Sequence, residues 1–326
     1  MIARGTQSSD AQRLSEHLSH RVERVGIAHW DDVEKRRNER GQMAGTWSNL
    51  GGAAGSYRCG VHRIELNAGE MPTPAHVHGE SEEIFYVLSG FGLTWMDEKA
   101  YEVRAGDCIV YKNFHEAHTI RAGDDGLDVL AFGPREYFTS SELPRGRTMW
   151  SITGFLEVQD GHPWDREPEL VWPEPEDERP GTIVNVADVE ADPFGGCRRR
   201  YVADEAGSRW TGMTYIECAP GKTSGPPHTH SAEEEIFVVI DGDGTFEIWP
   251  DTQHTVRTGS VVAVPPGAGF AHTFRGGPNG MTFLAWGTRE PNDICWYPRS
   301  RKMYWRGVGV SGRVEELEYW DGEEID

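Results

Sequence analysis

The apolar and polar residues along most of the chain alternate with a period of two, as in β-strands. In residues 83–88 alternate positions would face opposite sides of a strand, and both sides are largely apolar. Similar runs recur between glycine-rich turns: GVHRIEL (60–66), EIFYVL (83–88), DCIVY (107–111) and LDVLAF (127–132). The pattern predicts an all-β fold whose strands are packed on both faces.

Residues 9–25 instead show the period of a helix. Ser9 followed by Gln12 resembles a capping box, and one stripe is apolar: Leu14, Leu18, Val22 and Val25. We expect a short N-terminal helical segment that docks on the protein or on a second copy, making a homodimer. A lone helix of mixed charge is not a DNA-reading element.

The strand pattern occurs twice. When residues 56–92 are compared with residues 208–244, 15 of 37 positions are identical without a gap. The match resumes at a shift of 154, where HTIRAG (118–123) meets HTFRGG (272–277). Two copies of one unit are therefore present, each a sandwich or barrel.

Between the copies, residues 160–180 are rich in proline and acidic side chains. This composition predicts an extended, solvated connection. The expected division is a helical extension (1–44), barrel 1 (45–156), a linker (157–180), barrel 2 (181–290) and a tail (291–326). The tail is rich in Trp, Tyr and Arg, and we expect it to pack on a barrel or on a second subunit.

Charge narrows the classes of partner. The chain has 32 basic and 53 acidic residues, so its net charge is 32 − 53 = −21. Such a surface repels phosphate backbones and anionic lipid, which argues against nucleic acid and membrane partners. The five cysteines form no C-x-x-C pair, and the N-terminus lacks an apolar signal core. We therefore expect a reduced, cytoplasmic protein acting on a small molecule.

A repeated set of histidines and one glutamate predicts metal binding. His76 and His78 would project from the same face of a strand, Glu83 follows on the next strand, and His118 arrives after a later turn. The second copy supplies the corresponding residues: His228, His230, Glu235 and His272. Three imidazoles and one carboxylate suit a divalent first-row metal (Fe, Mn, Ni, Co or Zn), with one ion in each barrel.

Glu82 and Glu234 are repeated too, so repetition alone does not identify the ligand acid. Position in the strand favours Glu83 and Glu235, on the faces of Phe85 and Phe237. We expect Glu82 and Glu234 to be solvated turn residues.

These motifs resemble those of the cupin superfamily. GEMPTPAHVHGESEEIFYVLSG and GKTSGPPHTHSAEEEIFVVIDG are similar to its first motif, and GSVVAVPPGAGFAH (259–272) is similar to its second. GDCIVYKNFHEAH (106–118) lacks the usual P-x-G turn. The resemblance covers about residues 45–156 and 181–290, and it implies two tandem antiparallel jelly-roll barrels, each with a metal in its mouth.

The resemblance implies no particular reaction. A metal with open positions favours an enzyme, and we expect a dioxygenase. The alternatives are a non-oxidative isomerase, lyase or decarboxylase, and a binding cupin without turnover. The spacing from His78 to Glu83 resembles that of flavonol-cleaving bicupins and is one residue longer than in oxalate decarboxylases.

Differences between the copies suggest where catalysis occurs. Lys112, His115 and Glu116 precede His118, whereas the second copy has PPGAGFA before its histidine. His115 could relay protons at neutral pH, so we predict Glu83 and His115 as catalytic residues of barrel 1. The alternative is that barrel 2, which keeps the glycine–proline turn, is the active one. Aromatic side chains expected inside the barrels are Phe85, Trp95, Phe237 and Trp249.

Overall fold

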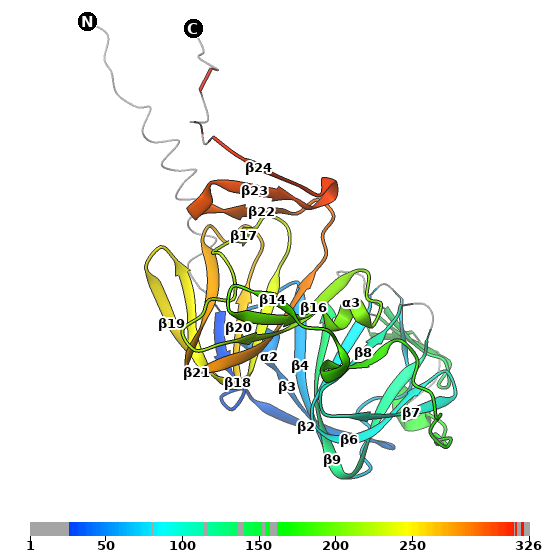
Figure 1. Cartoon of the computed structure of the whole chain (residues 1–326). Helices are drawn as coiled ribbons and strands as arrows, with labels where there is room; N and C mark the ends of the chain where they lie inside the picture. The colour runs from blue at the N-terminus through cyan, green and yellow to red at the C-terminus, as the bar shows by residue number, and fades with distance from the viewer. Residues whose placement is uncertain are drawn as a thin grey trace, which may run out of the picture.

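The computed structural model of the chain describes residues 26–79, 81–113, 116–135, 140–151, 154–156, 162–315, 317 and 321–322. Strands dominate these residues, and their ladders are antiparallel. Figure 1 shows two strand-built bodies side by side, each based on one eight-stranded sheet. The predicted pair of antiparallel barrels is confirmed.

Barrel 1 is the sheet with the order β13-β8-β6-β9-β4-β3-β2, and β7 pairs with β6. Its strands are β2 (Lys35–Arg40), β3 (Met43–Asn49), β4 (Cys59–Leu66), β6 (Glu83–Met96), β7 (Lys99–Arg104), β8 (Asp107–Tyr111), β9 (His118–Pro134) and β13 (Ile183–Asn185). A small sheet accompanies it, formed by β5 (Val77–His78), β10 (Ser140–Leu143), β11 (Thr148–Ser151) and β12 (Gly154–Leu156).

Barrel 2 is the sheet with the order β1-β20-β18-β21-β16-β15-β14, and β19 pairs with β18. Its strands are β1 (Gly26–His29), β14 (Asp192–Phe194), β15 (Cys197–Arg200), β16 (Thr211–Cys218), β18 (Glu235–Trp249), β19 (Thr252–Arg257), β20 (Ser260–Val264) and β21 (Ala271–Thr288). Its small sheet consists of β17 (Thr229–His230), β22 (Ile294–Tyr297), β23 (Lys302–Trp305) and β24 (Val310–Arg313). The tail of the chain therefore packs on barrel 2, as Figure 1 shows.

Helical segments within the described residues are short. They are α2 (Leu50–Ala53), α3 (Val202–Glu205) and four 3₁₀ turns at Pro163–Arg166, Val186–Asp188, Pro298–Ser300 and Arg306–Val308. The helix expected over residues 9–25 lies outside the described residues. Residues 26–44, predicted as part of a helical extension, instead form β1, β2 and the start of β3.

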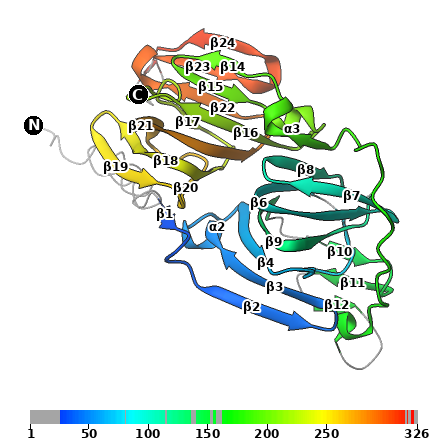
Figure 2. The ribbon, with the colours of Figure 1, turned by 60° about the horizontal axis from the view of Figure 1, so that its bottom comes forward.

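Each barrel takes one strand from the segment that precedes the other barrel. β1 comes before barrel 1 but pairs with β20, with Gly26 opposite Ala263. β13 follows the linker but pairs with β8, with Ile183 opposite Ile109. Figure 2 shows β1 beside β20, at the junction with α2 of barrel 1. The two halves are thus joined by backbone hydrogen bonds as well as by side chains.

The apolar core has three large clusters and one smaller one, and strands covered on both faces produce the three large clusters. Phe85 and Val87 lie in a cluster inside barrel 1, and Phe237 lies in the corresponding cluster of barrel 2. Ile84 and Tyr86, from the other face of β6, lie in a third cluster that contains residues of both barrels. The predicted alternation is confirmed, and the second face proves to be the interface between the barrels.

Two of the expected interior aromatic residues lie elsewhere. Trp95 is buried, but in a separate cluster with Met43, Met71 and Leu170. Trp249 is 40 % exposed, at the end of β18. Alternation places a side chain on a face, but it does not show where a strand leaves its barrel.

The described part of the linker is anchored on barrel 1 at several points, whereas the prediction was of solvation along its length; Val171, for example, is 83 % exposed, but its neighbour Leu170 is buried. Leu170 is buried against barrel 1, and its backbone N–H donates to the Gln42 side chain at 3.2 Å. Arg145 donates to Glu167 at 2.9 Å, and the N–H of Glu176 donates to the Ala100 carbonyl at 2.8 Å. Three apolar side chains of this segment pack in a cluster on barrel 1, and a count of prolines and acids takes no account of them: Trp164, Leu170 and Trp172.

Glu82 and Glu234 are buried at the interface, so their prediction as solvated residues was wrong. The Glu234 carboxylate accepts hydrogen bonds from the backbone N–H groups of Arg58 (2.7 Å) and Cys59 (2.6 Å), and from the Ser56 hydroxyl (3.0 Å). In the opposite direction, the Glu82 carboxylate accepts hydrogen bonds from the Ser208 hydroxyl at 2.6 Å and from the backbone N–H groups of the next two residues, 209 and 210. Each acid therefore caps a turn of the opposite barrel.

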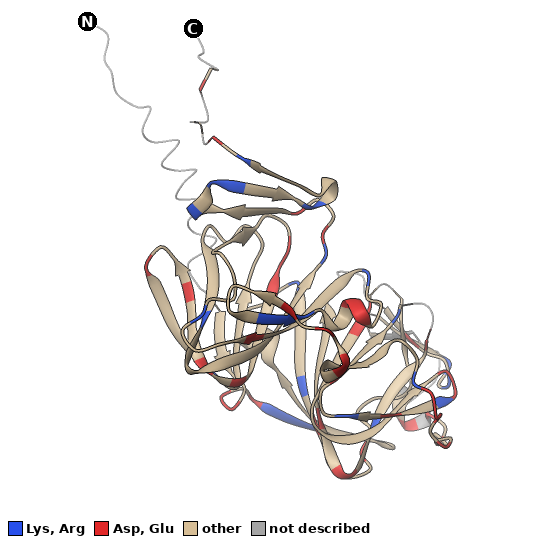
Figure 3. Ribbon diagram, in the orientation of Figure 1, with Lys and Arg blue, Asp and Glu red and all other residues tan. Residues whose placement is uncertain are grey.

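Charged residues are spread over both barrels, and basic residues gather along β2 (Figure 3). Within the described residues, no helix combines the length and apolarity needed to cross a membrane.

We predict that Glu234→Gln lowers the free energy of unfolding by about 2–4 kcal/mol, because an amide supplies a donor where backbone N–H groups need a charged acceptor. Urea unfolding of the metal-free protein measures this without any contribution from metal loss. Glu102→Gln is the matched control because Glu102 is exposed, and it should change stability by less than about 0.5 kcal/mol. Equal stability of the two variants would contradict the interface role.

Candidate metal centres

In barrel 1 the four expected ligands come together at the ends of three strands. His76 and His78 lie at β5, Glu83 begins β6 and His118 begins β9. The Nε2 atoms of His76, His78 and His118 lie 3.9, 3.4 and 3.1 Å from the same oxygen, Glu83 Oε2. Their ligand atoms are all within 4.8 Å of one another, which is the spacing of donors around one small cation.

Barrel 2 repeats this arrangement. The Nε2 atoms of His228, His230 and His272 lie 3.9, 3.6 and 3.2 Å from Glu235 Oε2. His76 bridges to His118 in barrel 1 and His228 bridges to His272 in barrel 2 through backbone hydrogen bonds, so the same local fold sets both groups.

Backbone carbonyls fix the orientation of several rings. His76 Nδ1 lies 2.9 Å from the Pro74 carbonyl, His118 Nδ1 lies 3.1 Å from the Glu116 carbonyl, and His228 Nδ1 lies 3.0 Å from the Pro226 carbonyl. A carbonyl only accepts, so each Nδ1 must donate. A neutral ring with its proton on Nδ1 presents a lone pair at Nε2, which is the form that binds a metal.

The electrostatics also suit a cation. Burial, together with the neighbouring histidines, lowers the pKa of His76 to about 3 and that of His228 to about 4, so both rings are neutral at pH 7. Burial raises the pKa of Glu83, but the neighbouring His118 and His78 outweigh it and hold this pKa well below its usual range. The carboxylate therefore stays ionised inside the protein.

Buried polar atoms without partners point to the same conclusion. Among the described residues, His78 Nε2, Glu235 Oε2 and His272 Nε2 are buried and have no hydrogen-bond partner. Such atoms destabilise a protein unless something binds them. A divalent cation between the Nε2 atoms and the carboxylate oxygen would satisfy each of them, so the residues fit the metal predicted for this site.

The two centres differ in what holds the second histidine. His78 Nδ1 lies 3.2 Å from the Ser141 hydroxyl, whereas His230 Nδ1 lies 2.6 Å from Asp293 Oδ2. Asp293 is 1 % exposed. Burial lowers the pKa of His230, but the charge of Glu235 and the hydrogen bond to Asp293 outweigh it and raise this pKa to about 11. The His230 ring is therefore protonated at pH 7 before a metal binds, and a metal would have to displace the proton on Nε2. Once that proton is lost, a carboxylate partner at Nδ1 makes a histidine a stronger metal ligand than a hydroxyl does.

A cavity of about 180 Å³ opens onto the centre of barrel 2. Three ligands line it, and so does Arg199 of β15. The Arg199 guanidinium lies 4.0 Å from the centre of the Phe194 ring and donates to the Ser224 carbonyl at 2.5 Å. Its Nε is buried and has no hydrogen-bond partner among the described residues. The remaining lining is largely aromatic or small: Tyr201, Thr214, Ile216, Phe237, Phe274, Phe283 and Ala285.

Barrel 1 has two hollows of similar size near its centre. One hollow of about 190 Å³ lies beside His76 and is lined by Leu143, Trp150 and Trp164. Another of about 160 Å³ touches His78 and Glu83 and is lined by His62 and Arg135. The Tyr111 ring stacks on His118 at 3.8 Å between centroids. This centre is therefore enclosed by more apolar and aromatic area.

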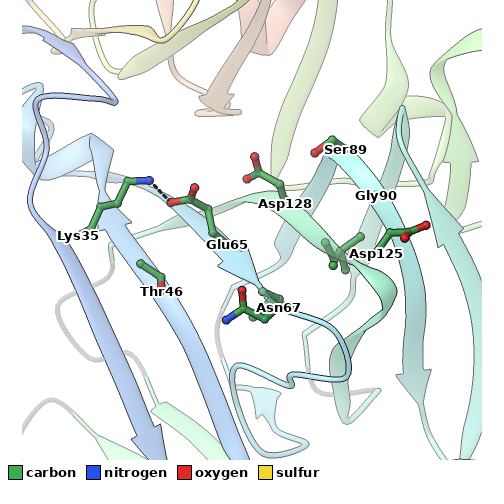
Figure 4. Close-up of a pocket in the computed structure, with 11 residues that line it drawn as sticks. Lys35, Thr46, Glu65, Asn67, Ser89, Gly90, Asp125 and Asp128 are labelled. Atoms are coloured by element: carbon green, nitrogen blue, oxygen red, sulfur yellow. Dashed lines mark hydrogen bonds and ion pairs between the residues drawn. The ribbon is translucent and has the colours of Figure 1, made fainter.

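A further hollow, of about 440 Å³, lies away from both centres (Figure 4). Three of the four charged side chains that line it have partners, since Lys35 pairs with Glu65 at 2.6 Å and Asp128 pairs with Arg63 at 2.7 Å. None of the eight expected ligands lines it. We therefore place no function there.

The structure thus brings together all eight residues expected as ligands. His115 lies outside the described residues, so its catalytic role stays a prediction. Sequence reasoning missed Arg199, Asp293 and His62. Arg199 and Asp293 have no counterpart of the same type in the other copy, so a comparison of the repeats does not reveal them.

Comparisons with known proteins agree with this geometry. Residues 62–132 and 214–286 each match the cupin domain family. The chain therefore contains two cupin domains. With two such domains in tandem, it is a bicupin.

Solved structures show the same fold. A mutant of Bacillus subtilis oxalate decarboxylase is 15 % identical, with a TM-score of 0.55 over 81 % of this chain and 77 % of that one. Lactobacillus farciminis oxalate decarboxylase, as a formate complex, is 16 % identical, with a TM-score of 0.56 over 84 % of this chain and 88 % of that one. A search of curated proteins found no match. At identities this low, the structural similarity establishes the fold only, and the reaction has to be inferred from the residues of the site.

We predict two divalent metals per chain. The double substitution His76→Ala/His78→Ala should remove one of them and His228→Ala/His230→Ala the other, because each removes two of four ligands. Elemental analysis of the purified proteins measures the stoichiometry. His254→Ala, a histidine of β19 outside both groups, should keep both metals. Unchanged metal content in both double variants would refute the ligand assignment.

The Asp293 contact gives a second expectation. Asp293→Asn should weaken metal binding at barrel 2 by about 10–100-fold, because His230 loses its carboxylate partner. Ser141→Ala at barrel 1 is the corresponding change and should have a smaller effect. Zinc competition against a chelator, with the other centre disabled by its double alanine substitution, measures each site separately. A larger loss from Ser141→Ala would contradict this reasoning.

Proposed function

We propose that this bicupin is a metal-dependent enzyme that acts on a small carboxylate in a non-oxidative reaction at barrel 2. The observation that carries the proposal is Arg199, which lines the same cavity as His228, Glu235 and His272. A guanidinium beside a cation centre provides two positive groups for one small anion.

Arg199 is well placed for this role. Its contacts with Phe194 and with the Ser224 carbonyl hold the side chain, while Nε has no partner among the described residues. A planar guanidinium can use such unpaired N–H groups to bind a carboxylate. Pre-positioning lowers the entropy that substrate binding would otherwise cost.

Barrel 1 differs at the corresponding position. Arg199 lies opposite Ile216 in the β15–β16 ladder, and Trp47 lies opposite Ile64 in the equivalent β3–β4 ladder. Trp47 makes an edge contact with His62 at 5.9 Å between ring centroids. Trp47 carries no charge, and the arginine near the barrel 1 centre is Arg135, which lines the hollow at His78 and Glu83. Its guanidinium already donates to the Ser56 carbonyl at 2.9 Å and to the Asn49 side chain at 3.0 Å, so it is less free than Arg199 to bind an anion.

The size of the cavity favours a small substrate. About 180 Å³ is less than the roughly 300–1,000 Å³ typical of pockets for drug-sized ligands. Phe237 and Phe274 provide flat apolar walls. A short acid with few carbon atoms fits these limits better than a multi-ring compound.

The bound metal would act as a Lewis acid that stabilises negative charge developing on substrate oxygen atoms. His228, His230, His272 and Glu235 would hold it, and Arg199 would orient the substrate carboxylate. Decarboxylation, isomerisation and lyase reactions all develop such charge. Support for the decarboxylase option comes from the two solved structures above, which are both of oxalate decarboxylases.

Other assignments stay predictions. Measuring oxygen uptake would distinguish a dioxygenase from the non-oxidative reaction proposed above. Substituting Glu83 and His115 would distinguish catalysis at barrel 1 from catalysis at barrel 2. Manganese is a reasonable first metal to test, because the structurally similar B. subtilis oxalate decarboxylase has Mn(II) centres. We also propose a homodimer in the cytoplasm, a compartment that suits the absence of disulfides among the described cysteines as long as no oxidant accumulates.

We predict that Arg199→Met lowers the affinity of the manganese-loaded protein for small carboxylates by about 10–100-fold, with metal content unchanged. Titration calorimetry with oxalate, malonate and pyruvate measures this. Arg198→Met is the matched control, since Arg198 is the exposed neighbour on β15. Equal affinities in the two variants, or oxygen consumption during turnover, would overturn the proposal.

A further inference from the structure

Two cysteines of barrel 2 face each other across neighbouring strands. Cys197 on β15 lies directly opposite Cys218 on β16, and their Sγ atoms are 2.7 Å apart. Both side chains are buried, at 2 % and 3 % exposure. We propose that Cys197 and Cys218 form a reversible disulfide, a modification site within barrel 2.

The backbone permits this bond without rearrangement. Directly opposed residues of an antiparallel pair have Cα atoms about 4.5–5.5 Å apart, within the roughly 4.4–6.8 Å that a disulfide spans. The other cysteines lie in different surroundings: Cys59 and Cys108 belong to the core between the barrels, and Cys295 lies opposite His230. Only one disulfide is therefore expected among the five cysteines.

The local chemistry distinguishes the two thiols. The hydrogen bond with Cys218 and the charge of Arg199 lower the pKa of Cys197, although burial opposes them. The hydrogen bond with Cys197 and burial raise the pKa of Cys218. Cys197 is therefore the thiol that ionises and attacks first.

The oxidant we propose is a low-molecular-weight disulfide. The Cys197 thiolate attacks one of its sulfur atoms and releases one small thiolate, leaving a mixed disulfide on Cys197. Cys218 then loses its proton and attacks the Cys197 sulfur, which releases the second small thiolate. The protein loses two protons and two electrons, and the oxidant is reduced to two thiols.

The bond would also constrain the strand that carries Arg199. Cys197 and Arg199 are two residues apart on β15, so their side chains share a face. A covalent link from Cys197 to β16 fixes this end of the strand next to the cavity. This consequence rests on the proposed role of Arg199, whereas the disulfide itself does not.

The test is a redox titration of the full chain. The protein is equilibrated in buffers of oxidised and reduced glutathione, then quenched in acid, unfolded, alkylated and weighed by mass spectrometry. We expect the number of alkylated thiols to fall from five to three, and protein weighed without alkylation should be about 2 Da lighter than the reduced form. Peptide mapping should show Cys197 linked to Cys218, and dithiothreitol should reverse the change. Burial makes equilibration slow, so the samples are followed for hours.

Two variants complete the test. Cys197→Ser should keep its remaining thiols free in every buffer. Cys108→Ser, the matched change at a buried cysteine in the core between the barrels, should still lose two thiols. Five free thiols at the most oxidising ratio, or a disulfide between any other pair, would overturn the proposal. Neither result depends on carboxylate binding, so failure here is distinct from failure of the proposed function.

Discussion

The arrangement of both metal centres depends on two buried carboxylates at the interface between the barrels. Glu82 and Glu234 each accept hydrogen bonds from a turn of the opposite barrel. Each directly precedes a predicted ligand, Glu83 or Glu235, which is the first residue of its strand. If the barrels separated, each carboxylate would lose its hydrogen-bond donors, and a charge left without them is strongly destabilising. The strand that presents each ligand acid is therefore held in register by its neighbour, and the barrels form one unit.

The same constraint explains which predictions from the sequence succeeded. Period-two alternation reports burial on a face, so it correctly indicated that both faces of β6 are covered. The repeat matched the eight predicted ligands in two sets, and their role as ligands stays a prediction. The alternation could not identify what covers each face, because Ile84 packs against residues of barrel 2, which are distant in the sequence. Glu82 and Glu234 were misassigned for this reason. A local pattern treats an acid beside a turn as solvated, whereas three-dimensional contact provides it with donors.

The linker shows a related limit. Its proline and acid content predicts an extended chain, and its path is largely irregular. Its few apolar side chains nevertheless anchor it, because Leu170 packs on barrel 1 and Trp172 lies beneath the Arg121 guanidinium at 4.5 Å. The composition of a segment is an average over all its residues, so it does not reveal that two or three of them are buried. The strand that follows, β13, then joins barrel 1 before the chain enters barrel 2.

Chemical differences between the centres arise outside the strands that carry the ligands. The small sheets that accompany the barrels place Ser141 beside His78, but Asp293 beside His230. The neighbouring ladder places Trp47 in one barrel and Arg199 at the same register in the other. These positions contribute little to barrel closure, so they can change without unfolding the protein. The ligands and the interface acids cannot change in this way, because each satisfies a buried group. Duplication thus preserved two similar centres while the surroundings of each became free to select a different ligand.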